Sequence, residues 1–325
     1  MVLPTLKIGE RLARFPFVQG GMAVRISTGV LAGAVAKTGA VGTIAGTGMT
    51  PDELKSEIRI ARSISDGIVG VNVLFAARKF AELIKTAISE RVDFIVSGAG
   101  FSRDMYGWGK EASVPVVSIV SSAGLARLAQ KLGAAAVVVE GAEAGGHLGT
   151  SRSVKEILPE VREATDLPVI AAGGVANGYE AADLFAMGAE GVQLATRFIA
   201  SEECTAPEAF KHMHVATPEE DIVLIDSPVG MPGRAIRNRF WSDVQEKGMS
   251  LPRKVCRSCL KRCSGRFCIL DALDRAQKGD VDGGLVFSGS SASRIKEILP
   301  VREIVRRLVE EASERLHRLQ AEPAH

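Results

Sequence analysis

Eight short, uniformly apolar runs recur along the first 200 residues, and they constrain the fold more than any other feature of the chain. These runs are rich in Val, Ile and Ala, and they do not alternate between apolar and polar residues. Such runs are typical of strands that are buried on both faces of a parallel sheet. The predicted strands cover residues 15–18, 41–45, 68–74, 93–96, 115–120, 135–140, 168–172 and 191–195.

Helical segments lie between these runs. Thr50, Pro51 and Glu53 supply an N-cap, a first-turn proline and a capping-box acid, which together predict a helix start. Gly133 and Gly188 stand where two of the helices are expected to end. The predicted helices cover residues 54–64, 78–90, 122–132, 153–164 and 179–187.

Strand-then-helix units with a mean spacing of about 25 residues predict an α/β fold, a (β/α)8 TIM barrel that closes near residue 200. A doubly wound open sheet is the alternative, but eight strands would make such a sheet long. Glycines at the strand ends also favour the barrel, because a TIM barrel builds its active face there. We expect residues 1–200 to form the barrel and residues 201–325 to form a C-terminal appendage packed on it. Within the appendage lie a cysteine cluster (253–268), a Gly-rich segment (279–291) and a final helix (293–316).

The composition fits a globular protein with a large core, because 46% of the residues are hydrophobic and 24% are charged. A formal net charge of +2 gives no global basic field for nucleic acid. No apolar stretch approaches the roughly 18 residues of a membrane helix. The N-terminal residues also lack the pattern of a secretory signal. We therefore expect a cytoplasmic protein without a membrane partner.

Four of the five cysteines lie within thirteen residues, at Cys256, Cys259, Cys263 and Cys268. In a reducing compartment this clustering favours metal binding over disulfides. The compact spacing is closer to the cysteine runs of iron–sulfur proteins than to two separated zinc knuckles. We expect a [4Fe–4S] cluster, with structural zinc and free thiols as the alternatives.

Basic residues surround this cluster, and no acidic residue lies between positions 253 and 268. They either offset the negative charge of a thiolate-bound cluster or form a docking patch (253–266) for an acidic partner such as a ferredoxin or an acyl carrier protein. Nucleic acid is not expected there, because Phe267 is the only aromatic ring in the stretch. The basic residues are Arg253, Lys254, Arg257, Lys261, Arg262 and Arg266.

Glycines after the last two predicted strands indicate a phosphate site. Gly173 and Gly174 follow the seventh strand, and Gln193, Ala195 and Thr196 end the eighth. In a TIM barrel these two loops commonly bind a phosphate through exposed backbone N–H groups. A simple tight turn at Gly173–Gly174 is the alternative.

A second glycine-rich loop follows the sixth strand and carries His147. Its residues Glu140, Gly145 and Gly146 can lie against a planar ligand, and the imidazole can exchange protons near neutral pH. A structural role for His147 is the alternative. Further candidates at strand ends can recognise the edge and face of a flavin-like ring, although singly they could be packing or turn residues. These candidates are Gly20, Gly21, Met22, Asn72 and Gly98.

Taken as a set, these motifs resemble those of the nitronate monooxygenase (2-nitropropane dioxygenase) family and its relative, the FMN-dependent enoyl-[acyl-carrier-protein] reductase II. The resemblance covers nearly the whole chain. It rests on the segments 18–22, 70–72, 97–100, 140–147, 171–175, 188–198, 232–238 and 279–289.

The resemblance implies one FMN in the barrel mouth. Gly173, Gly174, Ala195 and Thr196 would hold its phosphate, with the ring edge near Gly21, Met22 and Asn72. His147 matches the active-site histidine of the family, which handles the substrate proton. Two features depart from the family pattern: Ala195 stands where relatives usually have glycine, and the four-cysteine motif is an addition.

We therefore expect an FMN-dependent oxidoreductase that acts on a small activated substrate such as a nitronate. An enoyl-thioester reductase or another iron–sulfur flavin reductase, supplied by NAD(P)H or by an electron-donor protein, is the first alternative. A nonenzymatic electron-transfer or nucleic-acid-binding protein is the second, and a flavin-free enzyme for a phosphate-bearing ligand is the third.

Overall fold

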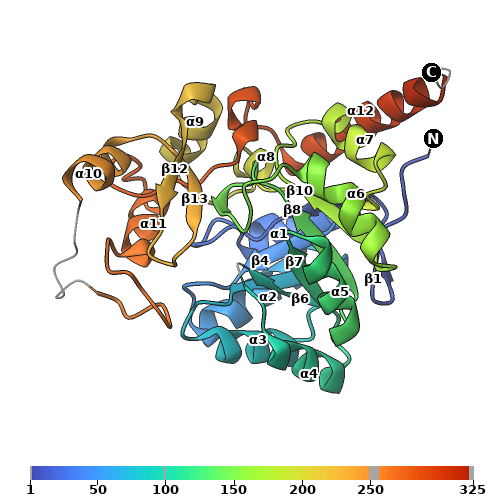
Figure 1. The fold of residues 1–325 in the computed structure, drawn as a ribbon, viewed down its shortest axis with the longest axis horizontal. Coiled ribbons are helices and arrows are strands. Elements are labelled where there is room, and N and C mark those ends of the chain that lie inside the picture. Colours follow the sequence, from blue (N-terminus) through green and yellow to red (C-terminus); the bar gives the residue numbers. More distant parts are fainter. Residues whose placement is uncertain (1, 99, 249–255, 322–325) are drawn as a thin grey trace.

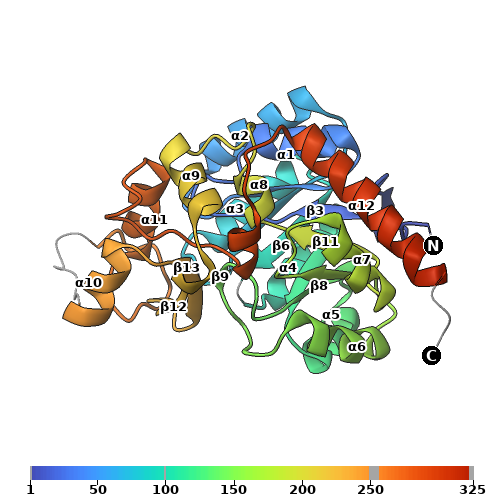
Figure 2. The same cartoon turned by 90° about the horizontal axis from the view of Figure 1, so that it is seen from above.

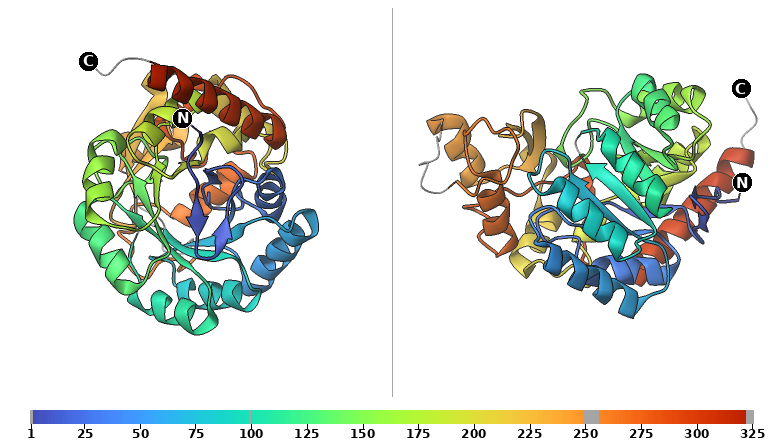
Figure 3. Two further views of the ribbon diagram at one scale, coloured as in Figure 1. Left: turned by 90° about the vertical axis from the view of Figure 1, so that its right-hand side faces the viewer. Right: turned by 90° about the horizontal axis from the view of Figure 1, so that it is seen from below.

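The computed structural model describes residues 2–98, 100–248 and 256–321. Its centre is a sheet of eight parallel strands in the order β3-β11-β10-β8-β7-β6-β5-β4. The two end strands meet, because Gln19 N donates to Val41 O at 2.8 Å and Val41 N donates to Phe17 O at 2.9 Å. The sheet is therefore a closed barrel, and the view along its axis shows the surrounding ring of helices (Figure 3, left). The predicted TIM barrel is confirmed.

Each predicted strand is found within a few residues of its expected bounds. Most strand residues are buried because they face either the barrel interior or the helices outside. The barrel strands are β3 (Phe17–Gln19), β4 (Gly42–Ala45), β5 (Val69–Leu74), β6 (Phe94–Gly98), β7 (Val116–Val120), β8 (Ala136–Glu140), β10 (Val169–Ala172) and β11 (Gly191–Leu194).

The five predicted helices are confirmed, and two further helices lie in the ring. Thr50 and Glu53 form the predicted capping box of α2, and Gly133 ends α5 in the left-handed conformation. The ring helices are α1 (Gly29–Thr38), α2 (Pro51–Ile64), α3 (Phe80–Ser89), α4 (Arg103–Ala112), α5 (Ala123–Leu132), α6 (Val154–Ala164) and α7 (Gly178–Ala186).

The last helix, α12 (Val301–Ala321), packs against α7 and α1 and fills the remaining place in the ring (Figures 1 and 2). The prediction of a helix from residue 293 was wrong at its start. Residues 290–294 form the short helix η3 (Ser290–Arg294), and α12 begins only after Pro300. A proline ring excludes the preceding turn of a continuous helix, so the helix starts directly behind it.

Opposite ends of the barrel are covered by different parts of the chain. The hairpin of β1 (Lys7–Ile8) and β2 (Arg11–Leu12) lies across the end where the strands begin (Figure 3, left). Its residues Leu6 and Ile8 are buried in one cluster with Val18 and Phe94 of the barrel interior.

Over the other end, residues 222–248 and 256–289 form a layer that we name the cap (Figure 1, orange and gold). The cap has its own apolar core, in which Phe240 and Phe267 pack edge to face at 5.3 Å between ring centroids. Strand β13 joins the cap to the barrel loop that contains β9 (Gly146–His147). The elements in and beside the cap are α8 (Thr196–Ile199), α9 (Glu208–Ala216), η1 (Glu219–Asp221), β12 (Ile222–Asp226), β13 (Pro232–Ile236), α10 (Arg239–Lys247) and α11 (Ile269–Gln277).

Candidate functional site

A cavity of about 600 Å³ lies between the carboxyl ends of the barrel strands and the cap. This is the end at which TIM barrels carry their active sites, and the volume is that of a typical ligand pocket. Most residues that the sequence singles out lie on its wall. They are Gly20, Gly21, Met22, Asn72, Gly98, Glu140, Gly145, Gly146, His147, Gln193, Ala195 and Thr196.

Gly21 and Asn72 lie side by side on the barrel side of the cavity. A Cβ atom at Gly21 would be 2.6 Å from Asn72 Cβ, so a larger residue cannot take its place without a shift. Asn72 Nδ2 donates to Gly21 O at 3.5 Å, whereas Asn72 Oδ1 is buried without a hydrogen-bond partner. Burying a hydrogen-bond acceptor without a donor lowers the stability of the folded protein. The position therefore suits a ligand that brings an N–H group to this wall.

Of the two loops of the predicted phosphate site, one lines the cavity and the other does not. Gln193, Ala195 and Thr196 line the cavity, and the Thr196 hydroxyl accepts a hydrogen bond from Gly289 N of the cap at 3.0 Å. Gly173 and Gly174 are not on the cavity wall, and they lie beside Glu143 instead. Their contact with a phosphate stays a prediction.

His147 is held between the barrel and the cap. In β9 it pairs with Gly233 of β13, and its Nε2 lies 2.8 Å from Ser227 Oγ. The ring of Phe287 packs edge to face against the imidazole at 5.2 Å. Burial lowers the pKa of His147 to about 4, so the imidazole is neutral at physiological pH.

Gly145 explains how this loop approaches the cap so closely. A Cβ atom there would lie 2.6 Å from Gly289 N and 2.7 Å from the carbonyl carbon of Ser288. Arg234 of β13 adds a further tie, because its Nη2 donates to Ala142 O at 2.6 Å. The loop that carries His147 is therefore packed against cap backbone along its length.

Glu140 ends β8 and contributes a second titratable group to the cavity wall. Burial raises its pKa to about 7. Burial is the cause of this shift, and no hydrogen bond or neighbouring charge within the described part of the chain counters it. Glu140 can therefore be protonated or ionised near neutral pH.

Sequence reasoning missed Ser227, which contacts His147 from 80 positions further along the chain. It lies in a Ser-Pro-Val-Gly turn between β12 and β13 that carries only a turn signal. Phe287 falls inside a segment that contributes to the family resemblance, but nothing in the sequence indicates that it contacts the imidazole.

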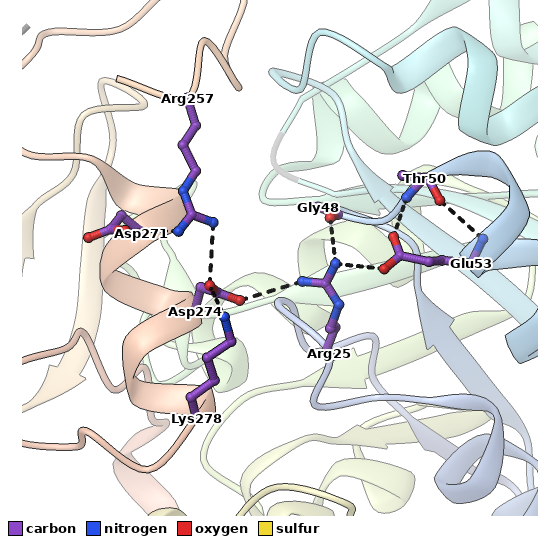
Figure 4. A network of polar contacts seen from close by, with 8 residues as sticks. All are labelled: Arg25, Gly48, Thr50, Glu53, Arg257, Asp271, Asp274 and Lys278. Atoms are coloured by element: carbon purple, nitrogen blue, oxygen red, sulfur yellow. Dashed lines mark hydrogen bonds and ion pairs between the residues drawn. The ribbon is translucent and has the colours of Figure 1, made fainter. Parts of the chain in front are cut away.

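An ion-pair network fastens the cap over the cavity (Figure 4). Asp274 of α11, whose side chain is 7% exposed, lies 3.6 Å from Arg25, 3.3 Å from Arg257 and 2.8 Å from Lys278. Arg25 also contacts Glu53 at 3.0 Å and so links α11 to the start of α2. Although burial opposes it, the hydrogen bond and charge of Lys278 lower the pKa of Asp274.

The four-cysteine segment is part of the cap and rests on the barrel rim. Arg78 N donates to Cys259 O at 3.0 Å, and Lys261 N donates to Ala76 O at 2.9 Å. Cys259 lines the cavity. All four thiols are free: Cys256 and Cys263 are exposed, whereas Cys259 and Cys268 are at least partly buried. Among the described residues no three His, Cys, Asp or Glu side chains are grouped to hold a metal ion, so the predicted cluster is not supported by the structure.

Several basic residues of this segment have local partners. Arg257 pairs with Asp271 and Asp274, and Arg266 Nη1 lies 2.8 Å from Asp226. Lys261 Nζ lies 4.0 Å from the centre of the Phe75 ring. Arg253 and Lys254 lie outside the described residues. The predicted docking patch is therefore partly neutralised by its own neighbours.

No helix in the described ranges combines the length and the apolar character that crossing a membrane would require.

Comparison with known proteins identifies the family. The sequence pattern of the nitronate monooxygenase family matches residues 5–90 and 77–311. The (3aS,4S,5R,7aS)-5-hydroxy-7a-methyl-1-oxo-octahydro-1H-indene-4-carboxyl-CoA dehydrogenase of Rhodococcus jostii is 33% identical over 233 residues. That alignment spans 72% of this chain and 65% of the dehydrogenase, slightly less than two thirds of the relative. A "Probable nitronate monooxygenase" of Staphylococcus aureus is 26% identical over 73% of this chain and 79% of its own.

Solved structures agree with this assignment over most of the chain. FabK from Thermotoga maritima has a TM-score of 0.86 at 34% identity and covers 94% of this chain and 95% of its own. The nitroalkane oxidase of Streptomyces ansochromogenes has a TM-score of 0.80 at 26% identity, covering 94% and 98%. A nonenzymatic role has no support among these relatives. With its barrel, its lined cavity and these matches, the chain belongs to the nitronate monooxygenase family of oxidoreductase enzymes.

Proposed function

We propose that the protein is an FMN-dependent oxidoreductase that acts on a small activated substrate, a nitronate or a related compound. The observation that carries the proposal is Asn72 Oδ1, a buried acceptor without a partner on the wall of a ligand-sized cavity. The imide N–H at the edge of a flavin ring is a donor of the required kind. The residues present therefore fit the cofactor.

Within this proposal, Gly20, Gly21, Met22 and Asn72 would hold the ring, and Gln193, Ala195 and Thr196 would hold the phosphate end. When bound, FMN accepts the electrons that leave the substrate. His147, neutral and on the same wall, holds or moves a proton at the substrate.

An enoyl-thioester reductase is the second candidate. A nitronate has only a few heavy atoms, whereas the cavity continues along an apolar wall formed by Leu260, Leu270 and Leu273 of the cap. The exposed side chains of Arg78 and Lys79 lie at the same cavity. They would suit the phosphates of a thioester carrier. NAD(P)H or an acidic protein docked at residues 253–266 would supply the electrons.

The experiment that tests these candidates begins with flavin analysis of the purified protein. Turnover is then measured with nitronates under air and with enoyl thioesters plus NADH or NADPH. We expect bound FMN, and we expect His147→Gln to keep the flavin while losing about 10²-fold or more of the activity. His212→Gln, at an exposed histidine of α9, is the matched control and should retain full activity.

Absence of flavin would contradict the proposal and would favour the flavin-free enzyme for a phosphate-bearing ligand. Full activity of His147→Gln would remove the proton role of His147 and leave the flavin assignment intact.

We further propose that the four cysteines bind a metal centre, a [4Fe–4S] cluster or structural zinc, in the cytoplasm. Support comes from their spacing and from two repeated local contacts. Ser258 N donates to Cys256 Sγ and Gly265 N donates to Cys263 Sγ, each at 3.4 Å, and Ser258 and Gly265 both have positive φ. Such amide donors stabilise thiolate sulfur.

Iron, sulfide and zinc analysis of anaerobically purified protein tests the metal proposal. We expect one metal centre per chain and its loss in Cys259→Ser. Cys204→Ser changes a buried thiol outside the cluster and should keep the metal. Metal-free protein with normal flavin content would contradict the proposal.

A further inference from the structure

The hydroxyl group of Ser227 is the only polar side-chain group that contacts the His147 ring among the described residues. Its oxygen lies 2.8 Å from Nε2, which is a strong hydrogen-bond distance. Ser227 is 6% exposed, so water does not readily compete for this contact. The direction of this hydrogen bond decides which imidazole nitrogen carries the proton.

The donors and acceptors around Ser227 favour one direction, in which the hydroxyl group donates to Nε2. Val229 N donates to Ser227 Oγ at 3.3 Å and occupies one acceptor site of the hydroxyl. The hydroxyl proton has no acceptor other than His147 Nε2 among the described residues. If Nε2 carried the proton instead, the buried Ser227 O–H would be left without an acceptor, which costs free energy.

The remaining nitrogen, Nδ1, belongs to a residue that lines the cavity, and it is not fully enclosed. It has no partner among the described residues, and it is not one of the enclosed polar atoms that lack a partner. His147 itself lines the cavity. Because burial keeps the imidazole neutral, the ring carries a single proton. A bound molecule therefore meets the nitrogen that Ser227 leaves protonated.

The ring is also held against rotation. Phe287 packs edge to face on it, and the Phe287 carbonyl oxygen lies 3.2 Å from Nε2 of the buried His214. The pairing of β9 with β13 fixes the backbone of His147 next to Gly233. Exchange of the two ring nitrogens by a flip would break the contact with Ser227 and disturb the packing with Phe287.

We propose that Ser227 is a positioning residue that locks His147 in the Nδ1–H tautomer, so that His147 meets the substrate as a hydrogen-bond donor and not as a base. The proposal deepens the proposed function and rests on it. It selects substrates that present an oxygen acceptor, such as the anionic oxygens of a preformed nitronate or a thioester carbonyl. A neutral nitroalkane, whose C–H proton a base would have to remove, is not a substrate of this arrangement.

The test combines spectroscopy with a substrate comparison on the flavin-loaded protein. ¹⁵N NMR of labelled histidine separates protonated from unprotonated ring nitrogens, and the spectrum of His147→Gln assigns the His147 signals. We expect Nδ1 protonated and Nε2 unprotonated in the wild-type protein. Ser227→Ala should move the proton population toward Nε2, and Ser227→Thr, which keeps a hydroxyl group, should restore the wild-type signals.

Turnover of propyl-2-nitronate and of 2-nitropropane is measured on the same variants. We expect the wild-type protein to turn over the nitronate but not 2-nitropropane. We expect Ser227→Ala to lose about tenfold in kcat/KM on the nitronate, the size of one hydrogen bond. Ser63→Ala, which removes an exposed hydroxyl group on α2, is the control and should change neither readout.

A wild-type spectrum with the proton on Nε2 would overturn the tautomer assignment, and it needs no variant to fold. Equal turnover of 2-nitropropane and its nitronate would overturn the donor role. Full activity of His147→Gln would likewise overturn the donor role. Purified protein without flavin that still shows the expected spectrum would instead overturn the proposed function, so the two failures are distinguishable.

Discussion

The barrel and the cap are stabilised by different kinds of contact. In the barrel, hydrogen bonds run around a closed ring of strands, and the interior holds apolar side chains such as Phe94, Val138 and Ile170, each at most 2% exposed. The cap has a smaller apolar core and is joined to the rim by short main-chain pairings and by ion pairs centred on Asp274. The barrel contacts are collective, whereas the cap contacts can be removed one at a time. The cap should therefore loosen without unfolding the barrel.

The largest effect is expected for Phe94→Ala in the barrel interior. Phe94 is fully enclosed, and its removal leaves a cavity that the closed ring cannot fill, at a cost of about 3–5 kcal/mol in the free energy of unfolding. Denaturant unfolding followed by fluorescence and circular dichroism measures this loss. Leu224→Ala in β12 is the control, because Leu224 is 49% exposed and its truncation should be nearly neutral. Equal losses in both variants would remove the contrast between barrel and cap.

A smaller and more local effect is expected for Asp274→Asn. The substitution keeps the shape but removes the charge shared by Arg25, Arg257 and Lys278, at a cost of about 2 kcal/mol. Hydrogen exchange should accelerate in α11 and along residues 256–268 and stay unchanged in the barrel strands. Asp243→Asn, which removes an ion pair within α10, is the control. Faster exchange throughout the barrel would show that the two regions unfold together.

The pH dependence of stability should show the contribution of Glu140, which lies on the cavity wall between the barrel and the cap. Because burial raises its pKa from 4.5 to about 7, the folded protein binds this proton more tightly than the unfolded chain does. The contribution of Glu140 is therefore fully present below pH 4.5 and is lost as the pH rises through 7. Compared at equal flavin content, Glu140→Gln should raise Tm relative to the wild type at pH 8 and leave it unchanged at pH 4. A Glu140→Gln variant whose Tm rises as much at pH 4 as at pH 8 would contradict this assignment.

The smallest effect is expected on the outer surface of the barrel. Arg152, just before α6, and Glu160 in the middle of α6 form an exposed ion pair, and solvent screens it. Glu160→Gln should leave Tm unchanged within error in low salt and in high salt. A clear loss of stability would mean that exposed ion pairs contribute to the barrel as Asp274 does to the cap.

The sequence predicts the barrel well because its strands are buried on both faces and therefore stand out as apolar runs. Helix α1 was not predicted, since Ala and Gly dominate it and give no amphipathic contrast. Helix α4 contains Gly107 and Gly109, which weaken its helical signal. The strands β12 and β13 of the cap are only partly buried, so no uniformly apolar run reveals them.

The candidate site is predictable in its glycines and in His147, because these lie at strand ends whose position follows from the barrel. The contacts made by Ser227 and Phe287 are not predictable in this way. They reach His147 from 80 and 140 positions away, through a cap whose fold has no local signature. Gly173 and Gly174 lie in the loop that the sequence predicts, yet they are not on the cavity wall. Correct placement of a loop in the sequence therefore does not establish that its residues line the cavity.

The pairing of β9 with β13 also bears on how such enzymes can diversify. His147 belongs to a barrel loop, yet its backbone is an edge strand of the sheet in the cap. The cap also supplies the apolar wall of Leu260, Leu270 and Leu273. Exchanging this layer for that of a relative would therefore transplant substrate preference and the setting of the histidine in one step. A change to the cap is therefore expected to alter the apolar wall of the cavity and the backbone support of His147 at the same time.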